Sequence, residues 1–294
     1  MKNVTLGKAE AIAHGAATIV NAIATGEGAA FGVDLWTKAQ VELTDEPKMI
    51  KGEIASDPSE NTFLIERAAA RVLEHFKVEK QFGAKVKTQS NIPIARGLKS
   101  SSVAANAVVL ATVVALGKSL DDLAVVNLGV DAAFDAKVTV TGAFDDACAS
   151  FFGGVVVTDN LKRKLIRQST LPEGFIVLFH VPSQKAYTGN SDVAKMRTVK
   201  QLVEVAYKEA LRGNFWTALS LNGLIYSSAL GYDASVALDA LNAGAVAAGL
   251  CGKGPAVTTV VPEDKIDPVK AALQRHEGEV VKAGLNHEKA RVVT

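Results

Sequence analysis

The chain of 294 residues predicts an α+β fold with two domains, in which mixed sheets pack on helices. Segments with the two-residue hydrophobic period of strands alternate with segments of helical spacing in both halves of the chain. Hydrophobic residues make up 48% of the sequence, which is enough for a substantial core. The pattern changes between residues 159 and 172, so we expect one domain over 1–160 and a second over 161–294.

In the first half, alternation of apolar and polar residues predicts the strands, and helical spacing with capping residues predicts the helices. Strands are expected over 4–14, 31–43, 84–90, 154–158 and 162–168, the last two as a hairpin around Asp159-Asn160. Helices are expected after Asp57-Pro58-Ser59, over 102–116, from a capping box at Ser119 to about 134, and briefly after Asp145.

In the second half, the same reasoning gives a buried strand followed by a group of helices and a mixed C-terminal region. Strands are expected over 175–181, 256–261 and 289–293. Helices are expected over 191–212, 214–230, 233–247 and 264–276.

Composition excludes several classes of protein. Lys plus Arg (32) nearly equals Asp plus Glu (31), so no global field favours nucleic acid or an acidic membrane as partner. The two cysteines, Cys148 and Cys251, suggest neither a disulfide framework nor a zinc site, and a cytoplasmic location fits them best. The sequence has no signal-peptide pattern and no apolar stretch of membrane-spanning length. A monomer and a homodimer both remain open.

The most informative segment runs from Pro93 to Ala105 and reads PIARGLKSSSVAA. Gly97 permits a backbone bend, and three serines follow where a new helix begins. The free N–H groups and the positive dipole end of such a helix can bind phosphate. The spacing is not that of a Walker A motif. An ordinary capped helix after a loop is the alternative interpretation of this segment alone.

The spacing of Pro93, Gly97, Leu98, Ser100 and Ser101 resembles the second motif of the GHMP kinases, Pro-x-x-x-Gly-Leu-x-Ser-Ser. Further motifs follow in the order of that family. Residues 141–154, TGAFDDACASFFGG, resemble the segment with the catalytic aspartate, and residues 249–257, GLCGKGPAV, resemble the third, Gly-rich motif. The first motif matches weakly, because residues 11–32 lack the usual Pro-Gly-Arg/Lys run. Residues 21–26, the segment from Pro93 to Ala105 (the serine loop) and residues 141–146 together look like the archaeal-type shikimate kinases, a branch of the family.

This resemblance implies a kinase that uses ATP and Mg²⁺ and phosphorylates the small molecule shikimate. It implies a GHMP-kinase-like architecture, with the nucleotide bound by the N-terminal domain and with Gly254 close to Gly97. The implied nucleotide-binding residues are Pro93, Ile94, Ala95, Arg96, Gly97, Leu98, Lys99, Ser100, Ser101, Ser102, Val103, Gly252 and Gly254.

Asp145 falls on the family's catalytic aspartate, which would accept a proton from the substrate. Asp146 replaces the usual amide, so which carboxylate is the base stays open; either aspartate is also a common helix cap. Ser101 falls on the family's metal-ligating serine. The family's second metal ligand, a glutamate, falls here on Phe134, so Asp135 or Asp131 could replace it, and a solvated carboxylate at a helix end is the alternative.

Shikimate carries a carboxylate and three hydroxyls, so its site needs a cation and short polar groups. Besides Asp145, the candidates are Asn21, Thr25, Lys185 and Arg197, although Arg197 lies in a predicted helix where an exposed salt bridge is an alternative. Rival functions are a homoserine- or mevalonate-type kinase, a diphosphomevalonate-decarboxylase-like enzyme and a nucleotide-binding regulator without catalysis.

Overall fold

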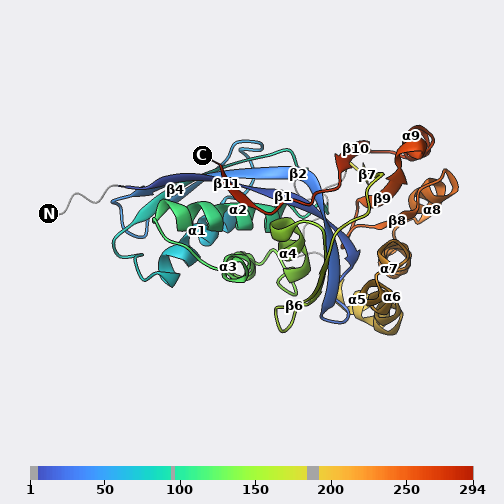
Figure 1. Ribbon diagram of the computed structural model, residues 1–294, viewed down its shortest axis with the longest axis horizontal. Coiled ribbons are helices and arrows are strands. Elements are labelled where there is room, and N and C mark those ends of the chain that lie inside the picture. The colour runs from blue at the N-terminus through green and yellow to red at the C-terminus, as the bar shows by residue number, and fades with distance from the viewer. Residues whose placement is uncertain (1–5, 94–96, 184–191, 294) are drawn as a thin grey trace.

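The computed structural model describes residues 6–93, 97–183 and 192–293 and confirms the α+β prediction, with two sheets that carry helices (Figure 1). The larger sheet has seven strands, ordered β11-β1-β2-β4-β3, with β5 added to β2 and β6 added to β5. Its strands are β1 (Lys8–Val20), β2 (Glu27–Thr44), β3 (Ile50–Ile54), β4 (Gly83–Ser90), β5 (Val155–Asp159), β6 (Lys164–Ser169) and β11 (Arg291–Val293).

The long strand β2 joins two parts of this sheet. Its first residues, Glu27–Phe31, pair with β5, and its later residues, Thr37–Thr44, pair with β4. The first part is buried on both faces, whereas the second alternates between buried and exposed side chains, as a strand with one covered face does. Both parts of β2 reach the site: Gly28 of the first part lies against Asp145, and Thr37 of the second part lines the cavity.

Four helices cover one face of the larger sheet (Figure 1). They are α1 (Phe63–His75), α2 (Ser100–Ala115), α3 (Asp122–Asp135) and α4 (Phe144–Phe152). Helix α2 is rich in alanine and valine and lies against both β1 and β2, with ten of its side chains buried. A helix that is apolar on nearly all sides belongs inside a protein, so α2 is the central element beneath the sheet.

The second sheet has four strands in the order β10-β7-β9-β8, all antiparallel. These strands are β7 (Phe175–Val181), β8 (Ala247–Leu250), β9 (Val257–Pro262) and β10 (Glu279–Gly284). The helices of this region are α5 (Val193–Thr198), α6 (Lys200–Arg212), α7 (Phe215–Leu230), α8 (Ser235–Asn242) and α9 (Ile266–Leu273).

Helix α7 connects the two sheets. It contacts β8 of the second sheet and β1 of the first. Gly223 of α7 meets Gly249 of β8 so closely that an added Cβ would collide with the opposing backbone. The backbone N–H of Asn21, at the end of β1, donates to Asn222 Oδ1 at 3.0 Å. One continuous core therefore includes residues from both sheets.

Several predicted elements differ from the structure. Strands β3, β8 and β10 were not predicted, and the helix expected over 233–247 ends at Asn242. The helix expected over 191–212 is broken at Val199 within the described residues. The cap of α3 is Asp121, whose carboxylate accepts from the N–H of Ala124, and not Ser119. The division into two domains near residue 160 stays a prediction. Strands β6 and β11 lie beyond this residue in the sequence and belong to the larger sheet.

Candidate active site

The serine loop leads into helix α2 through two residues in the left-handed region. Gly97 has φ +86° and Lys99, the residue before the helix, has φ +64°. Ser100, Ser101 and Ser102 then form the first turn of α2, where the N–H groups of Ser100 and Ser101 and the helix dipole point out of the helix, whereas the N–H of Ser102 donates to Lys99 O at 3.1 Å. This loop and helix start are the segment that the sequence predicts to bind phosphate, here called the phosphate cradle. Ile94, Ala95 and Arg96 lie outside the described residues.

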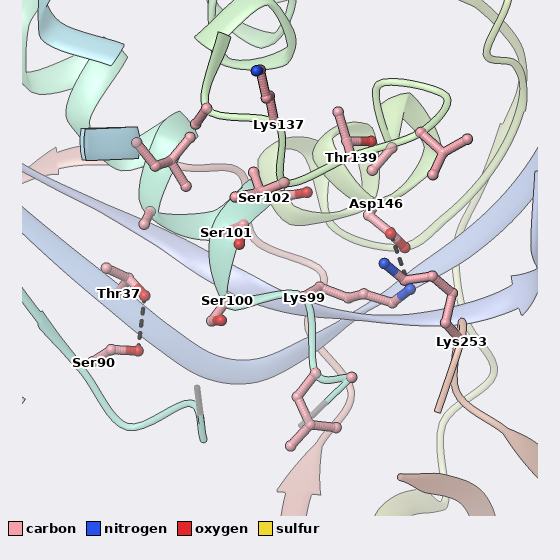
Figure 2. Close-up of a pocket in the computed structure, with 18 of the residues that line it drawn as sticks. Thr37, Ser90, Lys99, Ser100, Ser101, Ser102, Lys137, Thr139, Asp146 and Lys253 are labelled. Carbon is pink, nitrogen blue, oxygen red and sulfur yellow. Dashed lines mark hydrogen bonds and ion pairs between the residues drawn. The ribbon is translucent and has the colours of Figure 1, made fainter. Parts of the chain in front are cut away.

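This turn opens into a cavity of about 500 Å³ that is lined by several elements. Figure 2 shows the three serines at the start of α2, with Lys99, Asp146 and Lys253 close by. Among the predicted residues, those that line the cavity are Asn21, Gly97, Leu98, Lys99, Ser100, Ser101, Ser102, Asp145 and Gly254. Val103 is fully buried beneath the loop, and Pro93 is half-buried before it.

The predicted contact between the two Gly-rich segments is confirmed. A Cβ at Gly97 would lie 3.0 Å from Gly254 O and 3.3 Å from Cys251 O. Gly252 lies directly against the ammonium group of Lys99, so a Cβ at this position would collide with Lys99 Nζ. The two loops lie far apart in the sequence and pack backbone to backbone.

Asp145 lies in the first turn of α4 and is buried at the cavity wall. Its Oδ1 accepts a hydrogen bond from Asn160 Nδ2 at 2.8 Å. A Cβ at Gly28 would lie 2.5 Å from its Oδ2, so the glycine leaves space for the carboxylate. Burial and the neighbouring Asp146 raise the pKa of Asp145, while Lys99 and the Asn160 hydrogen bond oppose this. A carboxyl group with a raised pKa and a cavity beside it is suited to accept a proton.

Asp146 forms a buried ion pair with Lys99, whose Nζ lies 3.0 Å from Asp146 Oδ2. Its other oxygen, Oδ1, is buried and has no hydrogen-bond partner among the described residues. Burial disfavours the charged form of Lys99. The attraction of Asp146, together with that of Asp145, outweighs this effect, so the pKa of Lys99 is raised. Burial and the Lys99 cation lower the pKa of Lys253 to about 7.

The predicted substrate residues are distributed unequally around the cavity. Asn21 lines it, and its side-chain Oδ1 accepts from the N–H of Ile23 at 2.9 Å. Thr25 caps a local turn by exchanging hydrogen bonds with the backbone of Glu27 and does not line the cavity. Arg197 is exposed on α5, also outside the cavity. Lys185 lies outside the described residues.

The two predicted metal ligands also differ in their surroundings. Ser101 lines the cavity at the helix start. Asp135 lies at the end of α3, where its carboxylate accepts hydrogen bonds from Arg67 and Arg71 at 2.6–3.0 Å. Asp131 pairs with Arg163 at 2.7 Å. Neither aspartate is part of the cavity lining, and a metal role for Asp135 stays a prediction.

Sequence reasoning missed three residues of the site. Thr158 and Asn160 were interpreted only as parts of a hairpin, because Asn is common in turns. Their side chains instead form a buried chain that ends on Asp145. Lys253 lies within the third motif, but the sequence provided no reason to assign it a role. The glycines around it indicated only a tight loop close to Gly97.

The fold agrees with that of known small-molecule kinases. The structure of a homoserine kinase from Cytophaga hutchinsonii superposes with a TM-score of 0.75 at 17% identity, covering 100% of this chain and 99% of that chain. The mevalonate kinase of Methanococcus jannaschii gives a TM-score of 0.73 at 15% identity, covering 97% and 99%. These similarities show that the chain has the fold of these kinases.

Sequence comparison makes the relation specific. The model of the GHMP kinases N terminal domain matches residues 64–154. The shikimate kinase of Methanosarcina mazei is 45% identical over 282 residues, which cover 95% of each chain. The shikimate kinase of Halobacterium salinarum is 42% identical over 272 residues, covering 92% of this chain and 94% of that protein. The chain belongs to the GHMP kinase family.

Proposed function

We propose that this protein is a shikimate kinase, which transfers a phosphoryl group from ATP to a ring hydroxyl of shikimate and yields shikimate 3-phosphate. The observation that carries this proposal is the position of the buried Asp145 carboxylate, which lines the same cavity as the first turn of α2. A turn suited to bind the phosphates of ATP and a carboxylate suited to accept a proton would thus act in one cavity. The assignment of shikimate as the substrate rests on the similarity to shikimate kinases over nearly the whole chain.

The chain supplies positive charge where phosphoryl transfer needs it. The first turn of α2 offers N–H groups and serine hydroxyls to phosphate oxygens. Lys99 and Lys253 place two amino groups at the floor of the cavity, as Figure 2 shows. Charge spread over the transferred group is stabilised by such groups, since kinases depend on positioning and electrostatics more than on covalent chemistry.

Mg²⁺ fits this site through hard oxygen ligands. The Ser101 hydroxyl can hold the ion together with phosphate oxygens and water, which Mg²⁺ commonly retains. The phosphate oxygens of ATP would supply further hard oxygen ligands beside this hydroxyl. When bound, the ion would neutralise charge on the phosphate oxygens of ATP.

Asp145 would accept the proton of the attacking hydroxyl. Its raised pKa brings it nearer to the working pH, which favours general-base catalysis. Asn21, which lines the cavity with Asp145, is the polar residue that we assign to the hydroxyl-bearing face of the substrate. Arg197 and Lys185 remain candidate partners for the carboxylate of shikimate, and Thr25 remains a more remote one.

The structure contains no helix, within the described residues, that is long and apolar enough to cross a membrane. A cytoplasmic location, the absence of nucleic-acid partners and a monomeric or homodimeric state remain predictions from the sequence.

The test is direct. Purified protein is incubated with ATP, Mg²⁺ and shikimate; ADP release is followed in a coupled assay and the product is identified by mass spectrometry and NMR. Homoserine and mevalonate are the comparison substrates. Asp145→Asn, a change of nearly equal volume, should lower kcat by about 10²–10⁴-fold, the range for a lost general base, with little change in ATP affinity. Turnover of homoserine or mevalonate but not shikimate would refute the substrate and retain the kinase.

A further inference from the structure

Two buried side chains outside the family's motifs form a hydrogen-bonded chain to Asp145. Thr158 Oγ1 lies 2.7 Å from Asn160 Oδ1, and Asn160 Nδ2 lies 2.8 Å from Asp145 Oδ1. Thr158 has no exposed surface and Asn160 is 3% exposed. Their backbones are equally fixed, because Thr158 pairs with Gly28 across β5 and β2, and the N–H of Asn160 donates to Gly26 O at 2.8 Å.

We propose that Thr158 and Asn160 are positioning residues that hold the Asp145 carboxylate in the orientation and the ionised state in which it accepts a proton. The proposal rests on the proposed function, in which Asp145 is the base. Neither residue needs to touch the substrate. Both act through Asp145: Thr158 lies in β5, whose place in the sheet is set by its pairing with β2, and Asn160 directly follows this strand.

The direction of the hydrogen bonds supports this role. An ionised carboxylate only accepts hydrogen bonds, so Asn160 must turn its NH₂ group toward Asp145. The amide oxygen then faces Thr158, whose hydroxyl can donate to it at 2.7 Å. The alternative acceptor for that hydroxyl, Gly28 O, is more distant at 3.3 Å. The hydroxyl of Thr158 therefore selects the amide orientation that stabilises the charged form of Asp145.

The surroundings of Asp145 make such support necessary. Asp146 and Cys148 face it from α4, Lys99 faces it from the loop before α2, and Tyr226 faces it from α7. Burial and Asp146 favour the neutral acid, whereas Lys99 and Asn160 favour the carboxylate. Phosphate groups near Lys99 would compete for its charge. The hydrogen bonds from Asn160 and from the backbone of Asp146 would then support the ionised base in the presence of bound nucleotide, and Asn160 supplies the larger of the two.

Each deciding variant changes one side chain of this hydrogen-bonded chain. Thr158→Val removes the hydroxyl and keeps the β-branched shape, and Thr158→Ser keeps the hydroxyl. Asn160→Asp places a carboxylate against Asp145. The matched control is Thr259→Val, because Thr259 is also a fully buried strand threonine, and its hydroxyl donates to Leu178 O at 2.7 Å in the second sheet.

The first measurement is the titration of Asp145 in the ligand-free protein, followed by ¹³C NMR of labelled aspartate carboxyl groups and assigned with Asp145→Asn. We expect Thr158→Val to raise the pKa of Asp145 by about one unit, as the loss of support to a charged group implies. Thr158→Ser and Thr259→Val should leave it unchanged. This readout does not depend on shikimate turnover, so it stands even if another substrate is found.

The second measurement is the pH profile of kcat/KM for shikimate. In Thr158→Val we expect the acidic limb to move upward by about one pH unit and kcat at neutral pH to fall by about tenfold, with KM for ATP unchanged. Asn160→Asp should show a larger loss. If Thr158→Val and Thr259→Val lower thermal stability alike, with both the NMR titration and the pH profile at wild-type values, Thr158 and Asn160 are structural and the proposal is overturned.

Discussion

Lys253 brings an amino group of unusual acidity to the cavity. Burial first, and then repulsion from Lys99, lower its pKa to about 7 against the attraction of Asp146. The side chain is charged below that pH and neutral above it. Phosphate oxygens bind the charged form better, so the bound nucleotide and the proton on Lys253 stabilise each other.

We therefore expect the dissociation constant for ATP to rise as the pH increases from about 6 to about 9, and more steeply in the wild type than in Lys253→Met. The ionisation of ATP is common to both proteins, so their difference isolates this lysine. Isothermal titration calorimetry measures the affinities. Lys137→Met, at an exposed lysine that also lines the cavity, is the control and should retain the wild-type pH dependence. Parallel curves for the wild type and Lys253→Met would contradict this prediction.

The pair formed by Lys99 and Asp146 has side chains that are only 13% and 9% exposed. Removal of one partner from a buried pair leaves the other charge without compensation, which costs about 3–5 kcal/mol. We expect Asp146→Asn to lower the free energy of unfolding by about 3 kcal/mol for this reason. Saturating ATP should restore part of the loss, because its phosphates would compensate Lys99. Denaturant unfolding with and without ATP measures both effects.

Two further variants complete this experiment. Lys99→Met combined with Asp146→Asn should be more stable than Asp146→Asn alone, because no unpaired charge remains. Glu42→Gln removes an exposed pair with Lys8, 3.9 Å apart, and should change stability by less than about 1 kcal/mol. A loss in Asp146→Asn no greater than in Glu42→Gln would show that the buried pair contributes little.

At the level of elements, the two Gly-rich loops form one unit. Gly97 combines a φ of +86° with a close approach to Gly254, so Gly97→Ala imposes backbone strain and a tight contact of 3.0 Å between its Cβ and Gly254 O. We expect it to weaken ATP binding by at least about tenfold, since about 1.4 kcal/mol of distortion is sufficient. Gly117→Ala is the matched control, because its φ is +64° and nothing lies within 4 Å of an added Cβ.

Calorimetry with ATP separates the two glycine variants. Gly117→Ala should lose about 1 kcal/mol of stability through backbone strain and bind ATP normally. Equal ATP affinities in Gly97→Ala and the wild type would mean that the contact between the loops does not shape the phosphate cradle.

The elements that sequence reasoning found are those with strong periodicity or clear caps. Helix α2 and strand β4 lie within two residues of the predicted bounds. The missed strands lack such a signal: β8 reads AAGL, residues that rarely favour strands, and it is fixed by its contact with Gly223 of α7. Strands β3 and β10 are short sheet edges, defined by their partners more than by their own side chains.

The site was predictable in its backbone part and less so in its side chains. Fixed spacing around Gly97 predicted a phosphate-binding loop, because backbone geometry leaves a local sequence pattern, and the structure places this loop at the cavity. The contact of Asn160 with Asp145 depends on the pairing of β5 with β2, which brings residues together through the sheet and leaves no local pattern. The same holds for the two arginines that surround Asp135.

For the whole molecule, the larger sheet and the core depend on residues from both ends of the chain. Strand β6 extends this sheet beyond residue 160, and β11, near the C-terminus, pairs with β1. We expect a fragment of residues 1–160 to lack a cooperative thermal transition, whereas the full chain should unfold in a single transition. Circular dichroism and limited proteolysis of both measure this. A fragment that melts cooperatively would establish the predicted boundary as that of an autonomous domain.

The ion pair of Lys99 and Asp146 also has an evolutionary consequence. Each residue stands at a position where the family's general pattern requires no such charge, and Asp146 replaces an amide. Either charge alone would be buried with weaker compensation, because Asp145 would be the remaining counter-charge for Lys99, and the lost stability disfavours a chain with one charge and not the other. The two substitutions should therefore be inherited together. Among relatives of this chain, a lysine at the position of Lys99 should accompany an aspartate at the position of Asp146, and losses of the two should coincide on the same branches.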